Sequence, residues 1–210
     1  REVTLRPEMT PTVARMVAAK RRELPFPLRW YSIPNVFRYE RPQRGRLREH
    51  WQLNADLFGV EGIEADGEII FLVNKIMLAF GAESKDFEIR IANRKALDKK
   101  IAGFKLNNEK RKELMRLLDK KDKIPDFTSK LSSLIGVNDW SISADEEITA
   151  LIEASKKEGL NNVVFDSGII RGFEYYTGIV FEVYDTSSEN KRALFGGGRY
   201  DNLLDIFGES

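Results

Sequence analysis

The feature that most constrains the fold is a pair of strand-like segments, 28–40 and 48–58, joined by a short arginine-rich loop. The first segment breaks at Pro34, which has no backbone N–H to donate to a neighbouring strand. Side chains alternate between the two faces of a strand. The second segment therefore predicts a buried apolar face made of Trp51, Leu53, Ala55 and Leu57. Its opposite face is predicted to carry Arg48, His50, Gln52, Asn54 and Asp56.

This polar face permits two interpretations. An antiparallel sheet with one wet face gives the same alternation. We favour a ligand-binding face, because amides, an imidazole, a carboxylate and arginines orient a ligand, whereas ordinary wet faces carry mostly lysine, glutamate and threonine. On the first strand Arg38 and Glu40 share a face, and the adjoining loop contains three arginines. A planar guanidinium makes two parallel hydrogen bonds to phosphate, so the loop predicts a clamp for a polyphosphate.

The character of the chain changes twice along its length. Residues 1–92 mix strands and helices, residues 93–160 are helical and highly charged, and residues 161–210 return to β character. A helical lobe inserted into a sheet domain gives this order, so we predict an α+β fold with three regions. Helices are expected over 65–80 and 107–121, and a first helix with Thr10 as N-cap and Pro11 in the first helical position. The lysines of 107–121 indicate a solvated face more simply than a tRNA contact.

Composition excludes several classes of function. The chain has no cysteine and a single histidine, which excludes disulfides, thiolate zinc sites and metal sites with several imidazoles. The net charge of +1 argues against a strongly basic nucleic-acid coat protein. No apolar run reaches the length of a membrane span and no signal peptide opens the chain, so a cytoplasmic location without membrane attachment is expected. Because the sequence opens on Arg1, we expect a piece of a longer protein.

Three further segments are candidates for ligand binding. In the segment 5–11, Glu8 and Thr10 can both accept hydrogen bonds from an ammonium group, although Thr10 could equally cap the helix while Glu8 complements its dipole. The segment 171–182 combines Arg171 with aromatic residues. The glycine run of 195–203 lets backbone approach a ligand closely, but it matches neither a P-loop nor a dinucleotide-binding fingerprint.

Together these segments resemble the histidyl-tRNA synthetases, a family of class II aminoacyl-tRNA synthetases. Segment 37–56 is similar to their motif 2, and segment 171–178, Arg-Gly-Phe-Glu-Tyr-Tyr-Thr-Gly, to a histidine-specific peptide. The resemblance implies an antiparallel sheet flanked by helices, with the helical insertion at 93–160. It also implies ATP-dependent activation of histidine to histidyl-adenylate, transfer to tRNA(His), Mg²⁺ with ATP, and a homodimer in the full-length protein.

Motif 2 implies roles in binding ATP. Arg38 would hold the α-phosphate and Arg46 the outer phosphates. Glu40 would contact the adenine side and His50 would stack on the ring, although a solvent-facing strand histidine stays an open interpretation. We assign no metal ligands to the chain.

The remaining motifs imply the histidine site. Arg171 would act as a catalytic cation with Arg38 at the α-phosphate. The substrate would be held by residues of several segments: Glu8, Thr10, Gln52, Asp56, Tyr175, Tyr176 and Tyr200.

Some features depart from the family pattern. Asp56 stands where glutamate is frequent, and Phe173 and Glu174 replace the usual leucine and aspartate. Motifs 1 and 3 and the anticodon-binding domain are missing, so we expect impaired activity. A non-catalytic paralogue that senses histidine or tRNA is the main alternative, and it would be expected to lose motif 2 or the Arg-Gly-x-x-Tyr-Tyr string. A generic nucleotide-binding module would leave the tyrosine-bearing segments unexplained.

Overall fold

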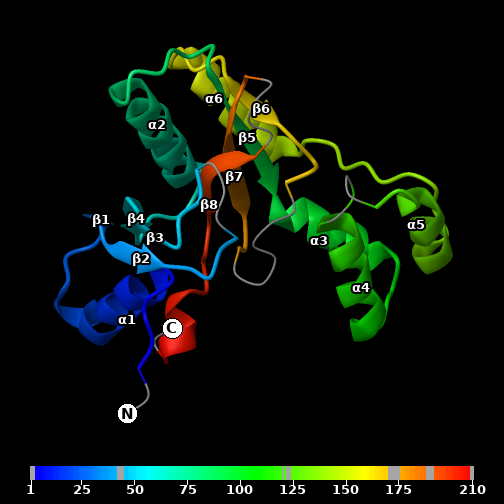
Figure 1. Cartoon of the computed structure of the whole chain (residues 1–210), viewed down its shortest axis with the longest axis horizontal. Coiled ribbons are helices and arrows are strands. Elements are labelled where there is room, and N and C mark those ends of the chain that lie inside the picture. The colour runs from blue at the N-terminus through cyan, green and yellow to red at the C-terminus, as the bar shows by residue number, and fades with distance from the viewer. Residues whose placement is uncertain are drawn as a thin grey trace. The chain divides into compact units, whose positions relative to one another are not determined.

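The computed structural model describes residues 3–41, 45–119, 121, 124–169, 176–187 and 192–208 (Figure 1). The chain divides into two compact units. Residues Arg1–Ala65 and Asn202–Ser210 form the first, called here the terminal unit, and Asp66–Asp201 form the second, called the central unit. The boundaries of the two units follow contacts in space. The three regions 1–92, 93–160 and 161–210 were defined by sequence composition, and this division into three stays a proposal.

The terminal unit contains two short antiparallel ribbons. Strand β1 (Leu28–Ser32) pairs with β4 (Asn54–Phe58), and β2 (Asn35–Phe37) pairs with β3 (Glu49–Trp51). The break predicted at Pro34 is confirmed. The second segment was predicted as one strand, but it also divides, between Trp51 and Asn54. At this break Gln52 N donates to Pro34 O at 3.0 Å.

One helix covers one face of the β1–β4 ribbon. Helix α1 (Thr10–Lys20), followed by the 3₁₀ turn η1 (Arg21–Glu23), places Val13 and Val17 against Leu28. Half-buried apolar side chains of the unit complete this core: Met9, Leu24, Trp30, Phe58 and Leu204, the last from η3 (Leu204–Phe207).

The expected cap of α1 is wrong by one residue. Met9 is the N-cap, without a side-chain capping bond, and Thr10 is the first helical residue. The Met9 carbonyl accepts hydrogen bonds from the backbone of Thr12 and Val13, so the chain turns into the helix one residue earlier than the threonine hydroxyl suggested.

The predicted burial of one face of the second segment is also wrong. Trp51 is 71% exposed and Leu53 is 44% exposed, and Ala55 is exposed as well. In contrast, His50, Gln52, Asn54 and Asp56 are half-buried. Alternation separated the two faces only over residues 50–56, because Arg48 is exposed and Leu57 is half-buried. It also could not show that the helix packs on the side of Trp30 and Phe58, the register partners of Asp56 and Leu28.

The central unit is built on a four-stranded mixed sheet in the order β6-β5-β7-β8. Its strands are β5 (Phe87–Asn93), β6 (Val163–Phe165), β7 (Ile179–Asp185) and β8 (Ala193–Gly198). All neighbouring pairs are antiparallel except β5–β6, which is parallel, so the sheet departs at one edge from the antiparallel expectation.

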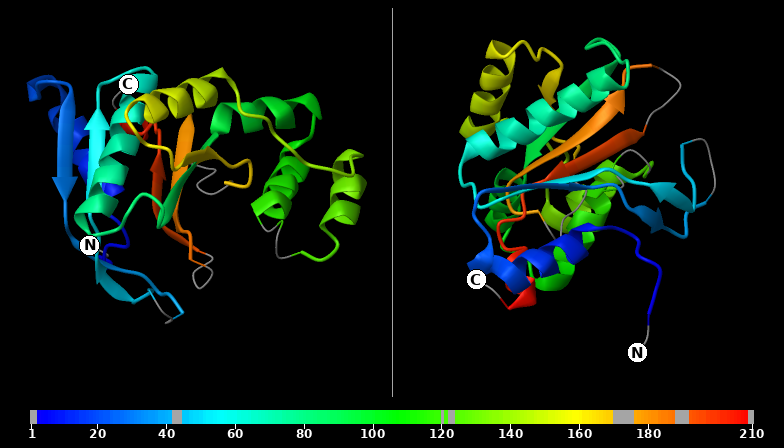
Figure 2. Two further views of the ribbon diagram at one scale, coloured as in Figure 1. Left: turned by 90° about the horizontal axis from the view of Figure 1, so that it is seen from above. Right: turned by 90° about the vertical axis from the view of Figure 1, so that its left-hand side faces the viewer.

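Two helices lie on the same face of this sheet (Figure 2). They are α2 (Ile63–Ala79), which begins at the boundary between the units, and α6 (Glu146–Lys157). A Cβ on Gly67 of α2 would lie 3.8 Å from Leu151 of α6, so the two helices are in close contact. The buried side of the sheet contributes Ile89, Ile91 and Val183 to this core.

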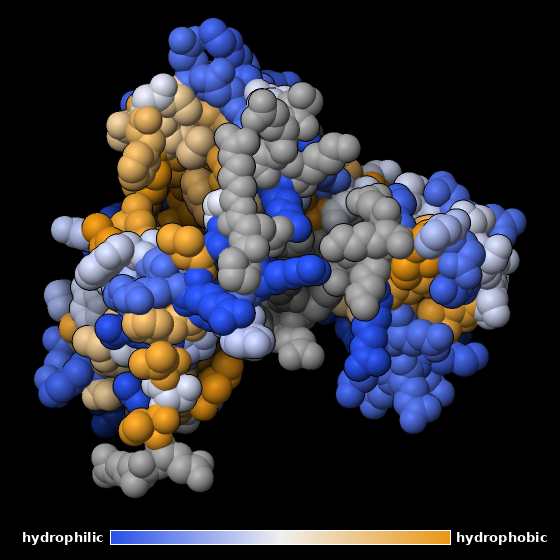
Figure 3. Space-filling model, viewed as in Figure 1, coloured by the Kyte–Doolittle hydropathy of each residue, from blue (hydrophilic) through white to orange (hydrophobic). Residues whose placement is uncertain are grey.

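A helical lobe with its own core extends from the sheet. It contains α3 (Arg94–Gly103), α4 (Asn108–Asp119) and α5 (Phe127–Ile135), and its buried residues are Leu97, Ile101, Leu114, Leu117, Leu118, Leu131 and Trp140. The helix expected over 107–121 is therefore confirmed together with its leucine stripe. The surface over α4 is hydrophilic (Figure 3), as a solvated charged face predicts.

Across the described part of the chain, we find no helix that is both long enough and apolar enough to cross a bilayer.

Candidate active site

In the terminal unit, Arg38 joins the segment that precedes α1 to the polar face of the second ribbon segment. Its Nε donates to Pro7 O at 2.8 Å, and its Nη2 donates to Gln52 Oε1 at 2.7 Å. The backbone of the same segment adds a bond from Phe37 N to Arg6 O at 2.9 Å. The predicted ammonium-binding residue Glu8, which is exposed, therefore follows directly on a residue that Arg38 holds.

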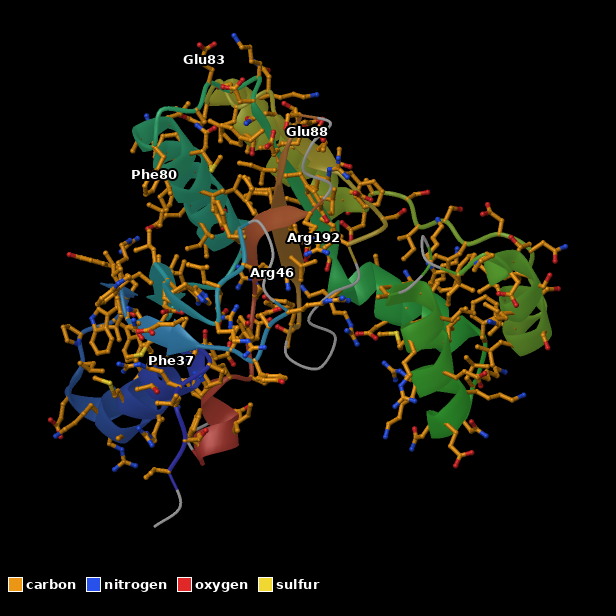
Figure 4. All side chains as sticks on the ribbon, viewed as in Figure 1. Phe37, Arg46, Phe80, Glu83, Glu88 and Arg192 are labelled. Carbon is orange, nitrogen blue, oxygen red and sulfur yellow. The ribbon has the colours of Figure 1, made fainter. Side chains whose placement is uncertain are left out.

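The arginine-rich loop carries an internal ion pair. Arg46 Nη1 lies 2.9 Å from Glu40 Oε2, and both side chains are partly exposed. Arg48 donates to Glu40 O at 3.1 Å and stacks over the ring of Tyr39 at 4.6 Å. The positions of Arg46, in this loop, and of Phe37, at the end of β2, can be followed in Figure 4. The two residues predicted to contact opposite ends of ATP are thus paired with each other.

The polar face continues along the strand as a row of half-buried groups. Gln52 Nε2 donates to Asn54 Oδ1 at 2.8 Å, which fixes the orientation of its amide. The Nδ1 atom of His50 is buried and has no hydrogen-bond partner among the described residues. Burial raises the pKa of Asp56 to about 6. A carboxyl group whose pKa is raised by burial is a candidate functional residue.

In the central unit, two predicted histidine-binding tyrosines lie against each other. The ring centroids of Tyr176 and Tyr200 are 4.6 Å apart, with an interplanar angle of 53°. Gly198 makes room for this arrangement, because a Cβ at that position would lie 2.7 Å from the ring of Tyr176. The glycine run therefore has a packing reason.

A cavity of about 230 Å³ adjoins Tyr176. Its lining combines apolar, glycine and acidic residues: Ile169, Tyr176, Val180, Phe181, Glu182, Gly196 and Gly197. Glu182 is only 8% exposed and accepts a hydrogen bond from the hydroxyl of Tyr184 at 2.5 Å. Sequence reasoning assigned Glu182 no role, although it stands at the end of the quoted motif 171–182. The signal in the sequence was an acid between Phe181 and Val183 in a largely apolar strand.

Arg199 ties the two tyrosine-bearing segments together. It forms a two-point ion pair with Asp66, through Nε at 3.2 Å and Nη2 at 2.7 Å, and a third contact with Asp201 at 3.3 Å. The hydroxyl of Thr177 donates to Asp201 Oδ2 at 2.8 Å. Sequence reasoning also missed this network, because Asp66 lies far from the other members along the chain and carries no local signal.

The charges in this network are strongly coupled. Burial disfavours the charge of Arg199, but hydrogen bonds and attraction from Asp66 and Asp201 outweigh it and raise the pKa of the guanidinium. The arginine is therefore a permanent cation, held beside two acids.

The remaining predicted residues are only partly located. Arg171 and Tyr175 lie outside the described residues. Thr10 is half-buried at the start of α1. The terminal unit thus gathers the predicted ATP and ammonium residues, and the central unit brings Tyr176 and Tyr200 together. No group of three or more acidic or histidine side chains suited to a metal ion occurs in the ranges that the structure describes.

Comparison with known proteins gives consistent matches. The family model described as histidyl-tRNA synthetase matches residues 1–136 and 128–210. A histidine–tRNA ligase of Leptospira biflexa is 45% identical over 99% of this chain and 53% of its own length, and one of Natronomonas pharaonis is 37% identical over 99% and 54%. The chain spans about half the length of the curated relatives it matches.

Solved structures support the same fold. One described as an ATP phosphoribosyltransferase regulatory subunit/histidyl-tRNA synthetase from Bacillus halodurans matches with a TM-score of 0.76 and 26% identity, over 97% of this chain and 59% of that one. The histidyl-tRNA synthetase from Nostoc sp. PCC 7120 matches with a TM-score of 0.74 and 24% identity, over 98% and 55%.

Proposed function

The chain belongs to the histidyl-tRNA synthetase family, and from that premise we propose that it is the catalytic core of a histidine–tRNA ligase. Such a core activates histidine with ATP and transfers it to tRNA(His). The observation that carries the proposal is the position of Arg38, which bonds both Pro7 and Gln52. A cation for the α-phosphate thereby lies beside acceptors for the substrate ammonium.

The proposed reaction is an in-line displacement. A carboxylate oxygen of histidine attacks the α-phosphorus of ATP, the bond to the bridging oxygen breaks, and pyrophosphate leaves with its electron pair. Arg38 and Arg171 neutralise the charge that develops on the α-phosphate, so orientation and fixed positive charge account for most of the rate. ATP enters as its Mg²⁺ complex.

Binding of ATP requires the loop to change its pairing. Glu40 is proposed to contact the adenine side and Arg46 the outer phosphates, yet the two side chains form an ion pair with each other. The pair is partly exposed, so opening it costs little, roughly 1 kcal/mol or less. His50, with its buried Nδ1, is proposed to stack on adenine.

The proposed histidine site combines acceptors for the ammonium with groups that recognise the ring. Glu8, Thr10 and Gln52 hold the ammonium. Asp56 and the tyrosines Tyr175, Tyr176 and Tyr200 contact the imidazole. With a pKa of about 6, Asp56 titrates close to free imidazole, whose pKa is about 6.5, so histidine binding is expected to weaken as pH falls below 6.

The wider biology of the protein follows from the same proposal. The full-length protein would be a cytoplasmic homodimer that binds tRNA(His). The second candidate function is a non-catalytic regulatory subunit that senses histidine or tRNA, since the similar structure from Bacillus halodurans is described as a regulatory subunit as well as a synthetase.

Ligand-dependent stability tests the proposal on the chain itself. A ligand that binds only the folded state raises the melting temperature by mass action. We expect histidine to raise it, and glutamine, asparagine and tyrosine not to do so. In Arg38→Lys the shift with MgATP should be lost and the shift with histidine should shrink, because Arg38 also holds Pro7 and Gln52. Arg29→Lys, which changes an exposed arginine of β1, should keep both shifts. No shift with millimolar histidine would contradict the proposal.

Isotope exchange separates the two candidate functions. Histidine-dependent exchange of pyrophosphate into ATP indicates a ligase core, and we expect it to be slower than in longer relatives, because the chain spans about half their length. Binding of histidine without any exchange would favour the regulatory function instead.

A further inference from the structure

The two tyrosines of the proposed histidine site come from segments that are separated in the sequence by strands β7 and β8. Tyr176 precedes β7 and Tyr200 follows β8, and their rings meet at a centroid distance of 4.6 Å. Such a contact is worth only about 0.5–1.5 kcal/mol beyond the area it buries. Their mutual position therefore depends on what holds the two segments.

The same two segments are joined through Arg199 and Thr177. Backbone bonds run from Thr177 N to Arg199 O at 2.8 Å and from Arg199 N to Ile179 O at 2.8 Å. The Thr177 hydroxyl accepts from Asp201 N at 2.9 Å and donates to Asp201 Oδ2 at 2.8 Å. Tyr200 therefore lies between two residues that are both bonded to the residue after Tyr176.

The Arg199 side chain extends this connection to α2. Its guanidinium meets both carboxylate oxygens of Asp66, and the two side chains are only 16% and 11% exposed. Two parallel, charge-assisted hydrogen bonds fix direction as well as distance. The stem of Arg199 lies against Gly178, where a Cβ would come within 2.9 Å of its Cδ. The arginine is thus held at its head by an acid and along its stem by the chain next to Tyr176.

We propose that Arg199 is a positioning residue, whose ion pairs with Asp66 and Asp201 hold Tyr200 against Tyr176. The consequence for ligand binding rests on the proposed function: the pair of rings forms one wall of the histidine pocket, so the network sets affinity for histidine and not for ATP. Lysine is a poor replacement for the arginine, because its single nitrogen lacks the planar fork that pairs with both oxygens of Asp66 in parallel and reaches Asp201 from another nitrogen.

The ring contact can be measured without any ligand. The chain has six tyrosines, so ring-labelled tyrosine gives a simple NMR spectrum in which the nuclear Overhauser effect between Tyr176 and Tyr200 can be assigned. We expect this effect in the wild type and its loss in Arg199→Lys and in Asp66→Asn. The control Arg90→Lys changes a half-buried arginine of β5 that is paired with Glu88 and Asp166, and it should retain the effect.

Binding constants then separate positioning from general damage. In Arg199→Lys the Kd for histidine should rise about tenfold or more, equivalent to about 1.4 kcal/mol, while the Kd for MgATP stays within about twofold. Thr177→Val, which removes the half-buried hydroxyl bonded to Asp201 and keeps the ion pairs, should give a smaller change in the same direction. Retention of the ring contact in both Arg199→Lys and Asp66→Asn would overturn the proposal, as would equal weakening of histidine and ATP binding.

The outcome for the proposed function is distinct. If the wild type shows the ring contact but binds no histidine, the proposed function fails. The positioning role of Arg199 is then decided by the ring contact alone.

Discussion

Asp56 illustrates how a single buried acid couples function to stability. It lies opposite Trp30 in the ribbon, and burial raises its pKa to about 6. An acid with a raised pKa holds a proton in the folded state that it has already lost in the unfolded state. Above pH 6 the side chain of Asp56 is a carboxylate, the form that accepts hydrogen bonds from a ligand or attracts a cationic one. In the same pH range it contributes least to the stability of the fold.

The pH dependence of unfolding tests this description. The folded state binds more protons than the unfolded state between about pH 4 and 6, so the contribution of Asp56 to the free energy of unfolding falls across that range and is constant above it. The total change is up to about 3 kcal/mol. We expect Asp56→Asn to remove this slope and to be more stable than wild type at pH 7, by denaturant unfolding at pH 4.5 and 7. Glu61→Gln, an exposed change in the same unit, should leave the slope intact. An unchanged slope in Asp56→Asn would contradict the raised pKa.

Arg171 carries the most specific chemical prediction. In a full-length protein, Arg171→Ala should abolish adenylate formation and leave histidine binding largely intact, because a fixed cation acts on the charge that develops at the α-phosphate. Pyrophosphate exchange and equilibrium binding of histidine measure the two effects separately. Near-normal exchange in the variant would remove Arg171 from the mechanism.

At the scale of elements, the tryptophans distinguish the uncovered ribbon face from the core of the helical lobe. Trp51 on β3 is 71% exposed, whereas Trp140 is 2% exposed and packs against Phe104, with Lys100 over its ring. The same residue type therefore contributes differently to stability in the two places.

Matched substitutions measure that difference. Trp140→Ala should lower the free energy of unfolding by about 3–5 kcal/mol, because it removes a buried ring and leaves a cavity. Trp51→Ala should change it by about 0.5 kcal/mol or less, as at other exposed positions. Denaturant unfolding with circular dichroism suits both variants, since it does not depend on the fluorescence of the deleted residue. Comparable losses in the two variants would show that the Trp51 face is covered in solution.

At the scale of the whole molecule, exposed apolar side chains gather on defined surfaces. On the terminal unit, Tyr31 is 75% exposed and is the register partner of Ala55, and Leu53 and Trp51 precede Ala55 at alternate positions. On the central unit, hydrophobic residues gather over α2 (Figure 3). Exposed apolar surfaces of this kind promote association between chains.

Sedimentation velocity over a range of concentrations tests the ribbon face. Leu53→Lys should weaken self-association, because it places a charge at the centre of the exposed apolar face. Met16→Lys is the matched control, since Met16 is similarly exposed, at 51% against 44%, but lies on α1. Equal effects of the two lysines would mean that the ribbon face has no particular part in association.

Much of the fold and of the candidate site followed from local patterns in the sequence. The break at Pro34, the leucine stripe of α4 and the two faces of the second ribbon segment depend on backbone chemistry and side-chain period, which act over a few residues. The family resemblance likewise depended on short contiguous strings such as 171–178 and 195–203. These features were predictable because each is specified by neighbours along the chain.

Other features were decided only by tertiary structure. Which face of the ribbon is buried depends on where α1 packs, and alternation is the same for either choice. The raised pKa of Asp56 depends on burial, and the role of Arg199 depends on Asp66, which lies 133 residues away in the sequence. Desolvation and long-range ion pairing are properties of groups brought together in space, so no local pattern could have specified them.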